Sequence, residues 1–167
     1  NFDKAQYIAG HSLGEYSALC CFGALAFEDT LKILKKRGRS MQEAVPANEG
    51  SMLAVLGSQL SVVEKLIKEN SEDCFIANNN SPQQVVVSGL KKNIDIFSEV
   101  LNKSNIKNIK LNVSAPFHCE LMNNATLKMK NIINQENFND PIYKVVSNVT
   151  AEEYKNTDEI KKLLIQQ

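Results

Sequence analysis

The sequence predicts an α/β fold in which a core of alternating strands and helices is interrupted by a smaller α/β segment. Three observations support this prediction. A glycine-flanked serine, Ser12, lies between a short apolar run and an apolar helix. Residues 51–111 show strand and helix patterns in the order βαββαβ. Strand and helix patterns of the core then resume and continue through residues 112–167.

The first element of the core is a strand-to-helix elbow. Residues 7–9 form an apolar run that predicts a strand, and the sequence GHSLG follows at residues 10–14. This G-x-S-x-G pattern is typical of the nucleophile elbow of an α/β-hydrolase-like core, in which a helix begins directly after the serine. We expect that helix at residues 15–22, with Gly23 as its stop. Both glycines are expected because the strained turn leaves no room for side chains; an ordinary loop serine is the alternative.

The chain contains two histidines, His11 and His118. A serine hydroxyl needs a base within hydrogen-bond reach to act as a nucleophile near neutral pH. The side chain of His11 diverges from that of its neighbour Ser12 at such a turn, so His11 is a poor base. If a histidine of this chain activates Ser12, His118 is the candidate by elimination. A histidine with a structural partner is the alternative interpretation.

A second helix is predicted at residues 28–43. Its apolar stripe consists of Leu31, Leu34, Gly38 and Met41, at spacings of three and four residues. Arg37 lies at the edge of that stripe, where a guanidinium needs an anionic partner. The partner is either a protein carboxylate or the anion of a ligand, and the alternative is a stem that reaches past the apolar face to solvent.

The interrupting segment follows a turn-rich boundary at residues 45–50. Strands are predicted at residues 51–56, 74–77, 84–88 and 106–113, helices at 61–70 (capped by Ser61) and 91–103, and a polar loop at 78–83. The order βαββαβ is the ferredoxin-like pattern. We therefore predict a ferredoxin-like subdomain at 51–111, inserted into an α/β-hydrolase-like core made of residues 1–50 and 112–167.

The core resumes with a turn at residues 114–118 that ends at His118. A helix is predicted at 120–134, a buried strand at 142–146 and a last helix at 158–164. The apolar positions of the first of these helices are Leu121, Met122, Leu127, Ile132 and Ile133.

Composition excludes several classes of partner. The chain has 167 residues, of which 43% are hydrophobic and 23% charged, as is ordinary for a soluble globular protein. Nineteen basic residues balance nineteen acidic ones, so net charge favours neither a nucleic acid nor a membrane as partner. No apolar stretch is long enough to span a bilayer.

The four cysteines are Cys20, Cys21, Cys74 and Cys119. No pair has the spacing of metal ligands, so we expect buried reduced thiols and no metal site. Cys119 stands beside His118, but nothing in the sequence indicates a lowered thiol pKa, and we interpret it as a packing residue.

Four segments together resemble one family. They are IAGHSLGEYSAL (residues 8–19), RGRSMQEA (37–44), NSPQQVVVSG (80–89) and VSAPFHC (113–119). Their order and spacing are similar to those of malonyl-CoA:acyl carrier protein transacylase of type II fatty-acid synthesis. The resemblance covers nearly the whole chain, and it implies the same architecture of a hydrolase-like core with a ferredoxin-like insert.

The resemblance also implies roles for individual residues. Ser12 is expected to take the malonyl group from coenzyme A as an ester, and His118 to serve as base and then acid. The backbone N–H of Leu13 is expected to bind the oxyanion. Arg37 is expected to bind the free malonyl carboxylate, which an acetyl group lacks.

Substrate contacts are further implied at His11, Met41 and Phe117; in related polyketide domains an aromatic residue at this last position accompanies malonyl rather than methylmalonyl selection. The expected substrates are malonyl-CoA and the phosphopantetheine thiol of acyl carrier protein, with no cofactor.

The abundance of Asn and Lys is typical of an AT-rich genome, which suggests a plastid-like organelle (apicoplast type) of a eukaryote, with a bacterial cytoplasm as alternative.

The family has a glutamine-containing, glycine-rich segment before the region matched here, and a glutamine-bearing loop with a Gly-Pro-Gly segment after it. We therefore expect this chain to be an internal fragment. Two other enzymes remain as alternatives: an acyltransferase domain of a polyketide or fatty-acid synthase, and a serine esterase using Asp73, Asp95 or Glu99 as the acid. A carrier-protein-binding module without activity is the third alternative.

Overall fold

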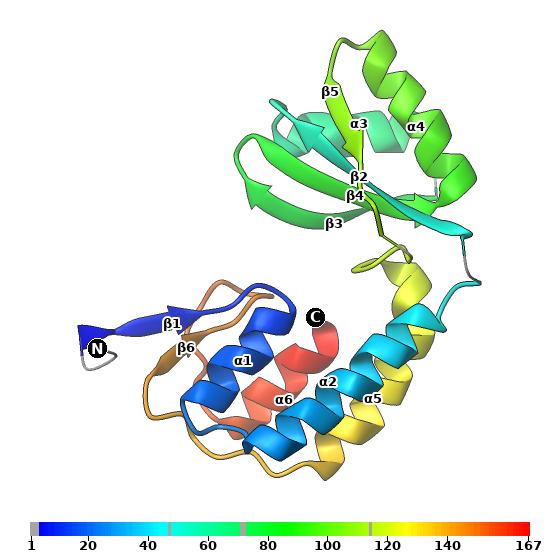
Figure 1. Cartoon of the computed structure of the whole chain (residues 1–167). Helices are drawn as coiled ribbons and strands as arrows, with labels where there is room; N and C mark the ends of the chain where they lie inside the picture. Colours follow the sequence, from blue (N-terminus) through cyan, green and yellow to red (C-terminus); the bar gives the residue numbers. More distant parts are fainter. Residues whose placement is uncertain (1–3, 47, 71–72, 114) are drawn as a thin grey trace. The chain divides into compact units, whose positions relative to one another are not determined.

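The chain folds into two compact units, each with its own hydrophobic core. The computed structural model describes residues 4–46, 48–70, 73–113 and 115–167 (Figure 1). One unit consists of residues 1–39 and 126–167, and the other of residues 40–125. One sheet is parallel and the other antiparallel, so the fold is mixed α/β.

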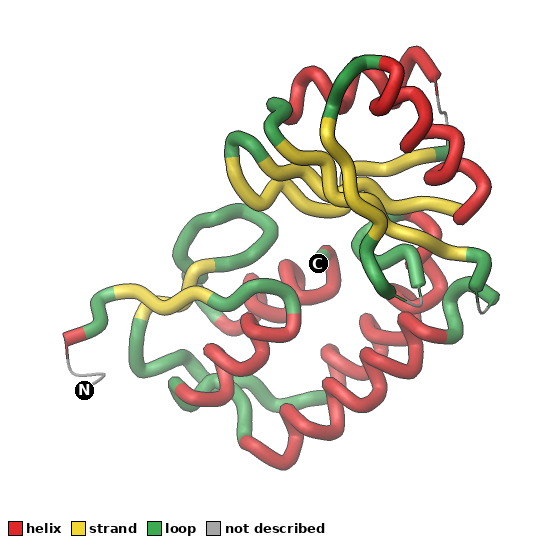
Figure 2. Tube along the Cα trace, turned by 45° about the horizontal axis from the view of Figure 1, so that its top comes forward, coloured by secondary structure: helices red, strands yellow, loops and turns green. Residues whose placement is uncertain are grey.

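The first unit combines a short parallel sheet with α-helices, which Figure 2 draws in yellow and in red. Strand β1 (Tyr7–Ala9) pairs with β6 (Lys144–Val146), with Ile8 opposite Val145. The helices are α1 (Leu13–Cys21), α6 (Thr157–Gln166), the first part of α2 (Phe27–Gln42) and most of α5 (Asn123–Gln135). The side chain of Asn156 caps α6 by accepting a hydrogen bond of 2.9 Å from the backbone N–H of Glu159.

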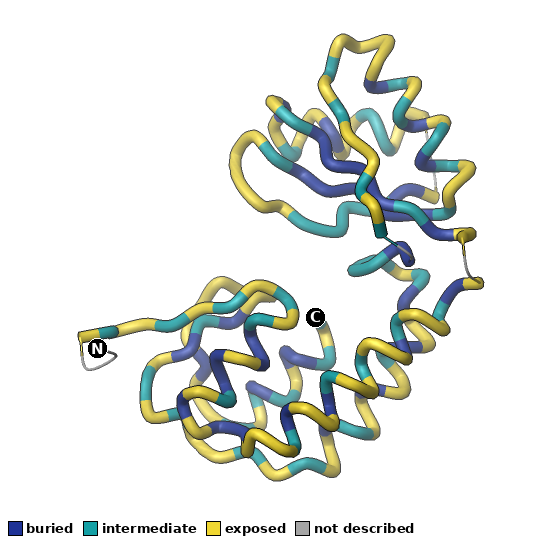
Figure 3. The backbone as a smooth tube through the Cα atoms, in the orientation of Figure 1, coloured by how far each residue is buried: buried dark blue, intermediate teal, exposed yellow. Residues whose placement is uncertain are grey.

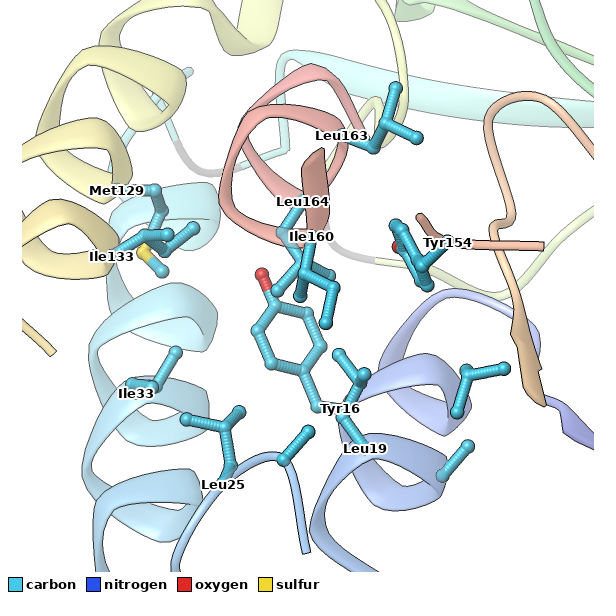
Figure 4. Close-up of a cluster of buried hydrophobic side chains, with 13 residues drawn as sticks. Tyr16, Leu19, Leu25, Ile33, Met129, Ile133, Tyr154, Ile160, Leu163 and Leu164 are labelled. Carbon is cyan, nitrogen blue, oxygen red and sulfur yellow. The ribbon is translucent and has the colours of Figure 1, made fainter. Parts of the chain in front are cut away.

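The core of this unit draws side chains from all four helices. Figure 4 shows the ring of Tyr16 among Ile33, Ile133 and Ile160 and their neighbours. Tyr16 and Leu19 of α1 are almost completely buried. Each Å² of apolar surface buried in this core stabilises the fold by about 25 cal/mol. The burial fixes α1, whose N-terminus carries Ser12, against the rest of the unit.

The second unit is built on an antiparallel sheet in the order β3-β4-β2-β5. Its strands are β2 (Gly50–Leu56), β3 (Cys74–Ser81), β4 (Gln84–Leu90) and β5 (Lys107–Lys110). Helices α3 (Leu60–Asn70) and α4 (Lys91–Lys103) pack on it, and buried side chains of the helices and the sheet form a cluster. The longest buried stretches of this unit, coloured dark blue in Figure 3, lie in β2 and β4. A 3-10 helix, η2 (Glu120–Met122), precedes α5.

The predicted apolar stripe of α2 is wrong at two of its four positions. Leu31 is 52% exposed and Gly38 is exposed, whereas Ile33 is fully buried. The inward face runs through Thr30, Ile33 and residues 37 and 40–41, at the spacing of a helix turned by about one residue from the predicted one. Leu31 has helical spacing to Leu34 but lies on the exposed side of α2.

The Asn-rich segment at residues 78–81 is strand and not loop, because it pairs with β4 up to Ser81 opposite Gln84. Residues 82–83 then form a tight two-residue turn. Backbone pairing across the hairpin outweighs the low strand propensity of asparagine. Ser61 lies inside α3 rather than at its cap, and β5 is shorter than predicted.

Other apolar and cysteine positions also differ from expectation. Leu127 is 64% and Ile142 is 77% exposed, and Met129 of α5 is buried instead. All four cysteines are free, but Cys21 is exposed. The predicted turns at 45–50 and 114–118 include residues 47 and 114, which lie outside the described residues. In the described part of the chain, no helix combines the length and the apolar character needed to cross a membrane.

Candidate active site

Ser12 occupies a strained turn between β1 and α1. Its backbone dihedrals are φ 54° and ψ −108°, outside the regions that L-residues ordinarily adopt. The turn is held by the N–H of Gly14, which donates to the carbonyl of His11 at 2.9 Å. The N–H of Ser12 donates to Oδ1 of Asn148 at 2.6 Å. The elbow therefore fixes Ser12 from both sides at the helix N-terminus, where backbone N–H groups lack intrahelical partners.

The two glycines of the elbow differ in the space that a side chain would have at each position. A Cβ on Gly10 would stand 2.0 Å from the carbonyl oxygen of Gly14 and 2.5 Å from the nitrogen of Glu15. A Cβ on Gly14 would meet nothing within 4 Å. The expectation that both positions exclude side chains is thus confirmed at Gly10 and wrong at Gly14, because Gly14 faces open space in the first turn of α1.

Arg37 of α2 points at the serine hydroxyl. Its Nη2 donates to Oγ of Ser12 at 3.0 Å and to Oε1 of Gln167 at 3.0 Å. The guanidinium carbon also lies 5.6 Å from the centroid of the Tyr16 ring, a cation–π distance. Arg37 is half-buried. A cation is thereby held directly beside the predicted nucleophile.

The carboxyl group of Glu15, the third residue of α1, belongs to the same cluster. Its side chain is fully buried. It accepts hydrogen bonds from the backbone N–H of Asn148 at 2.8 Å, from the hydroxyl of Tyr154 and from Nε2 of Gln167. Glu15 and Arg37 share Gln167 as a neighbour, since Gln167 donates to the carboxylate and accepts from the guanidinium.

Burial shapes the protonation of this cluster. Loss of hydration raises the pKa of Glu15, against the opposing effects of its hydrogen-bond donors and of Arg37. Loss of hydration also raises the pKa of Tyr16 to about 12 and, together with the hydrogen bond to Glu15, raises the pKa of Tyr154. Both phenols are therefore neutral at physiological pH, and that of Tyr154 donates to Glu15.

His118 lies in the second unit, in the loop between β5 and η2. Its φ is 57°, a conformation that non-glycine residues adopt infrequently. The half-buried side chain lines a pocket of about 450 Å³ with residues of α3 and β3, among them Ile67, Cys74 and Ile76. Strained backbone at both Ser12 and His118 is a feature that functional sites share.

The other predicted site residues are placed as follows. Leu13 is the first residue of α1, with its side chain 54% exposed, and His11 is exposed in the elbow. Arg37 and Met41 lie one turn apart on α2, and Met41 is half-buried. Phe117 is half-buried beside His118. The described contacts thus bring Ser12 and Arg37 together, whereas Met41, Phe117 and His118 belong to the other unit.

The competing nucleophile Cys119 and two of the competing acids, Asp73 and Asp95, have their own partners in the second unit. Burial raises the pKa of the Cys119 thiol, whose Sγ lies 3.1 Å from the carbonyl oxygen of Pro116. A raised thiol pKa disfavours the reactive thiolate. Asp95 forms an ion pair with Lys110, and Asp73 accepts a hydrogen bond from Asn93.

Sequence reasoning missed the partners of the elbow. Glu15, Asn148 and Gln167 were not identified as site residues, and Tyr154 was not identified as a buried hydrogen-bond donor to Glu15. Glu15 carries a usable signal, since it is an acidic residue on an otherwise apolar helix directly after the serine motif. Asn148 and Gln167 lie 136 and 155 residues from Ser12 in sequence, and no local pattern marks them.

Comparison with known proteins places the chain among acyltransferases. Residues 4–161 match the acyl transferase domain family. The malonyl CoA-acyl carrier protein transacylase of Bacillus subtilis is 41% identical over 165 residues, covering 96% of this chain and 52% of the relative. The enzyme of the same name from Escherichia coli K12 is 38% identical over 163 residues, covering 96% and 53%.

Solved structures agree with these relatives. The malonyl CoA-acyl carrier protein transacylase of Coxiella burnetii superposes with a TM-score of 0.93 at 36% identity, over 98% of this chain and 52% of that one. A malonyl-transacylase in complex with a type II polyketide acyl-carrier protein gives 0.94 at 33% identity, over 98% and 54%. The chain spans about half the length of the curated relatives it matches.

Proposed function

The chain belongs to the acyl transferase domain family, and from this premise we propose that it transfers malonyl groups from malonyl-CoA to the phosphopantetheine thiol of acyl carrier protein. The observation that carries the proposal is Arg37 Nη2, 3.0 Å from the hydroxyl oxygen of Ser12. The names of its relatives at 38–41% identity support the same reaction.

The reaction proceeds in two halves through an ester on Ser12. His118 takes the proton of Ser12 as its oxygen attacks the thioester carbonyl, and then gives it to the leaving thiolate of coenzyme A. The N–H of Leu13 stabilises the oxyanion. In the second half His118 takes the proton of the carrier-protein thiol, whose sulfur attacks the ester, and returns it to Ser12. No cofactor or metal takes part in this scheme.

Arg37 provides the acyl selectivity. In a malonyl thioester the free carboxylate is two bonds from the carbonyl carbon that Ser12 attacks. A guanidinium in contact with Oγ of Ser12 therefore lies within reach of that carboxylate when the carbonyl is in place. An acetyl group leaves the half-buried cation without its substrate anion, which costs roughly 1–3 kcal/mol. We assign His11, Met41 and Phe117 to the walls of the acyl site.

Several finer assignments belong to the same proposal. The parallel β1–β6 pair and the βαββαβ order of the second unit support a hydrolase-like core, residues 1–50 and 112–167, with a ferredoxin-like insert at 51–111. The relatives named above are bacterial, which supports a bacterial-type cytoplasmic enzyme; a plastid-like origin has only the Asn- and Lys-rich composition in its favour.

Of the two other enzymes considered, one has an observation in its favour and one does not. An acyltransferase domain of a polyketide synthase would use the same residues. The similarity to a malonyl-transacylase in complex with a polyketide acyl-carrier protein supports this alternative. A serine esterase shares the elbow but gives no role to the contact between Arg37 and Ser12.

Intact-protein mass spectrometry of the full-length protein tests the proposal. Malonyl-CoA should add one malonyl group to the wild type and none to Ser12→Ala, and acetyl-CoA should label far more slowly. Arg37→Ala should reduce the malonyl-to-acetyl ratio of acylation rates by about 10- to 100-fold. Arg39→Ala, an exposed cation on the same helix, is the control and should leave the ratio unchanged. Equal labelling by both donors in the wild type would refute selectivity for malonyl groups, and no label from malonyl-CoA would refute malonyl transfer itself.

A further inference from the structure

We propose that Glu15 is a positioning residue for this acyl transfer, holding both the backbone of Ser12 and the guanidinium of Arg37 through one closed ring of hydrogen bonds. The inference rests on the proposed function for its substrate. The ring passes through Glu15, Asn148, Ser12, Arg37 and Gln167 and returns to Glu15. All five residues belong to the first unit.

One arm of the ring fixes the serine backbone. Oε1 of Glu15 accepts the backbone N–H of Asn148 at 2.8 Å. The side chain of Asn148 then accepts the N–H of Ser12 at 2.6 Å. Because Ser12 has φ 54°, its backbone is held in an unfavourable conformation by such contacts and would otherwise relax. Through Asn148, Glu15 therefore sets the direction in which the hydroxyl of Ser12 points.

The other arm fixes the cation. Oε2 of Glu15 accepts a hydrogen bond from Nε2 of Gln167, which leaves Oε1 of that amide facing Arg37. The orientation of the Gln167 amide is thus determined by Glu15. With its oxygen turned to the guanidinium, Gln167 holds Arg37 Nη2 at 3.0 Å, and the same Nη2 reaches Oγ of Ser12.

The ring requires an acceptor-only group at position 15. A carboxylate accepts all three of its donors, the N–H of Asn148, the hydroxyl of Tyr154 and the amide of Gln167. In Glu15→Gln, the new amide NH₂ would face the NH₂ of Gln167. If the Gln167 amide turned over to accept from it, its own NH₂ would face Arg37. If instead the new amide turned over, its NH₂ would face the backbone N–H of Asn148, so every arrangement leaves two donors facing each other at one point of the ring.

The same logic predicts a rescue. In the double variant Glu15→Gln with Gln167→Glu, the amide at position 15 donates to the carboxylate at position 167, and that carboxylate accepts from Arg37. The oxygen at position 15 still accepts from Asn148 and Tyr154. Every donor again has an acceptor, and the number of charges is that of the wild type.

The experiment measures single-turnover acylation of the full-length protein by malonyl-CoA, giving a saturating rate and a half-saturating concentration. The reaction of Ser12 with a neutral sulfonyl fluoride is measured in parallel, because it needs no acyl recognition. Glu15→Gln should reduce the ratio of rate to half-saturating concentration by about 100-fold and also slow the sulfonyl fluoride reaction. The exchanged pair should recover most of both. Tyr154→Phe, which removes a donor to Glu15 outside the ring, should stay within about 3-fold of the wild type while losing stability.

The outcomes separate the inference from the function on which it rests. A wild type that takes no malonyl group refutes the proposed function, and the sulfonyl fluoride series still decides on Glu15. Glu15→Gln reacting at the wild-type rate refutes the ring. So does an equal loss in Tyr154→Phe, or an exchanged pair no faster than the single variant, since a merely structural role gives no reason for rescue by exchange.

Discussion

A methyl group on Gly10 should separate β1 from α1. In Gly10→Ala the new Cβ would lie 2.0 Å from the carbonyl oxygen and 2.1 Å from the carbonyl carbon of Gly14, about 1.4 Å short of the 3.4 Å at which ordinary contact begins. These are backbone atoms, so no side-chain rotation relieves the overlap. The strand and the helix must move apart by more than an ångström.

The cost of that movement follows from what α1 is packed against. Tyr16 and Leu19 are at most 1% exposed, so a shift of the helix disturbs the centre of the core. Overpacking of a core costs about 1–3 kcal/mol where side chains can adapt. Because here only backbone can move, we expect a loss of about 3 kcal/mol or more, a large share of the roughly 5–15 kcal/mol that stabilises a typical domain.

Gly14→Ala is the matched control in the same five-residue motif. Its Cβ meets nothing within 4 Å, and the position lies in the first turn of α1. Replacing glycine by alanine in a helix contributes up to about 1 kcal/mol of stability, so this variant should equal or exceed the wild type.

Urea unfolding followed by circular dichroism compares the two variants with the wild type. The midpoint of Gly10→Ala should fall with an unchanged slope, and that of Gly14→Ala should stay or rise. Equal midpoints for the two variants would refute the argument, because it attributes the whole difference to the close approach of Gly10 to Gly14.

Two further predictions concern the core. The folded-state pKa of Tyr16 is raised to about 12, so its contribution to stability is complete below pH 10 and falls by about 3 kcal/mol as pH rises from 10 to 12. The difference in unfolding free energy between the wild type and Tyr16→Phe should shrink by the same amount over this range. A constant difference would contradict the burial argument. Ile133→Ala should lower the unfolding free energy by about 2–5 kcal/mol, because Ile133 is fully buried. Leu127→Ala on the same helix should change it by less than about 0.5 kcal/mol, because Leu127 is 64% exposed. Similar urea midpoints for the two variants would overturn this distinction.

Local patterns predicted the elements that have local causes. The elbow, the C-terminal stop at Gly23 with φ 82°, and α4 at Lys91–Lys103 follow from glycine placement and helical spacing, and the structure confirms them. The position of Arg37 at the edge of a buried face is also confirmed, although Leu31 was wrongly assigned to that face. The helical spacing of Arg37 from Leu34 and Met41 was a better guide than the presence of a leucine at position 31.

The rest depends on contacts between distant segments. The asparagines of β3 form a strand because β4 supplies hydrogen-bond partners, which no property of the segment itself indicates. Asn148 reaches Ser12 because β6 pairs with β1 and so brings the loop that follows β6 to the elbow. The role of Glu15 depends on one local and one distant feature. Its carboxylate on an apolar helix is recognisable in the sequence, but its hydrogen-bond donors come from residues 148, 154 and 167.

The positive φ angles of Ser12 and His118 carry a consequence for how this protein can change. Glycine adopts φ near 55° without the steric cost that serine or histidine bears, so a glycine at either position relieves local strain while removing a predicted catalytic group. Screening a mutant library for thermal resistance alone would therefore tend to enrich inactive sequences at these two codons. Engineering of this scaffold for robustness has to hold both positions fixed and seek its gains elsewhere, for example at open sites such as Gly14.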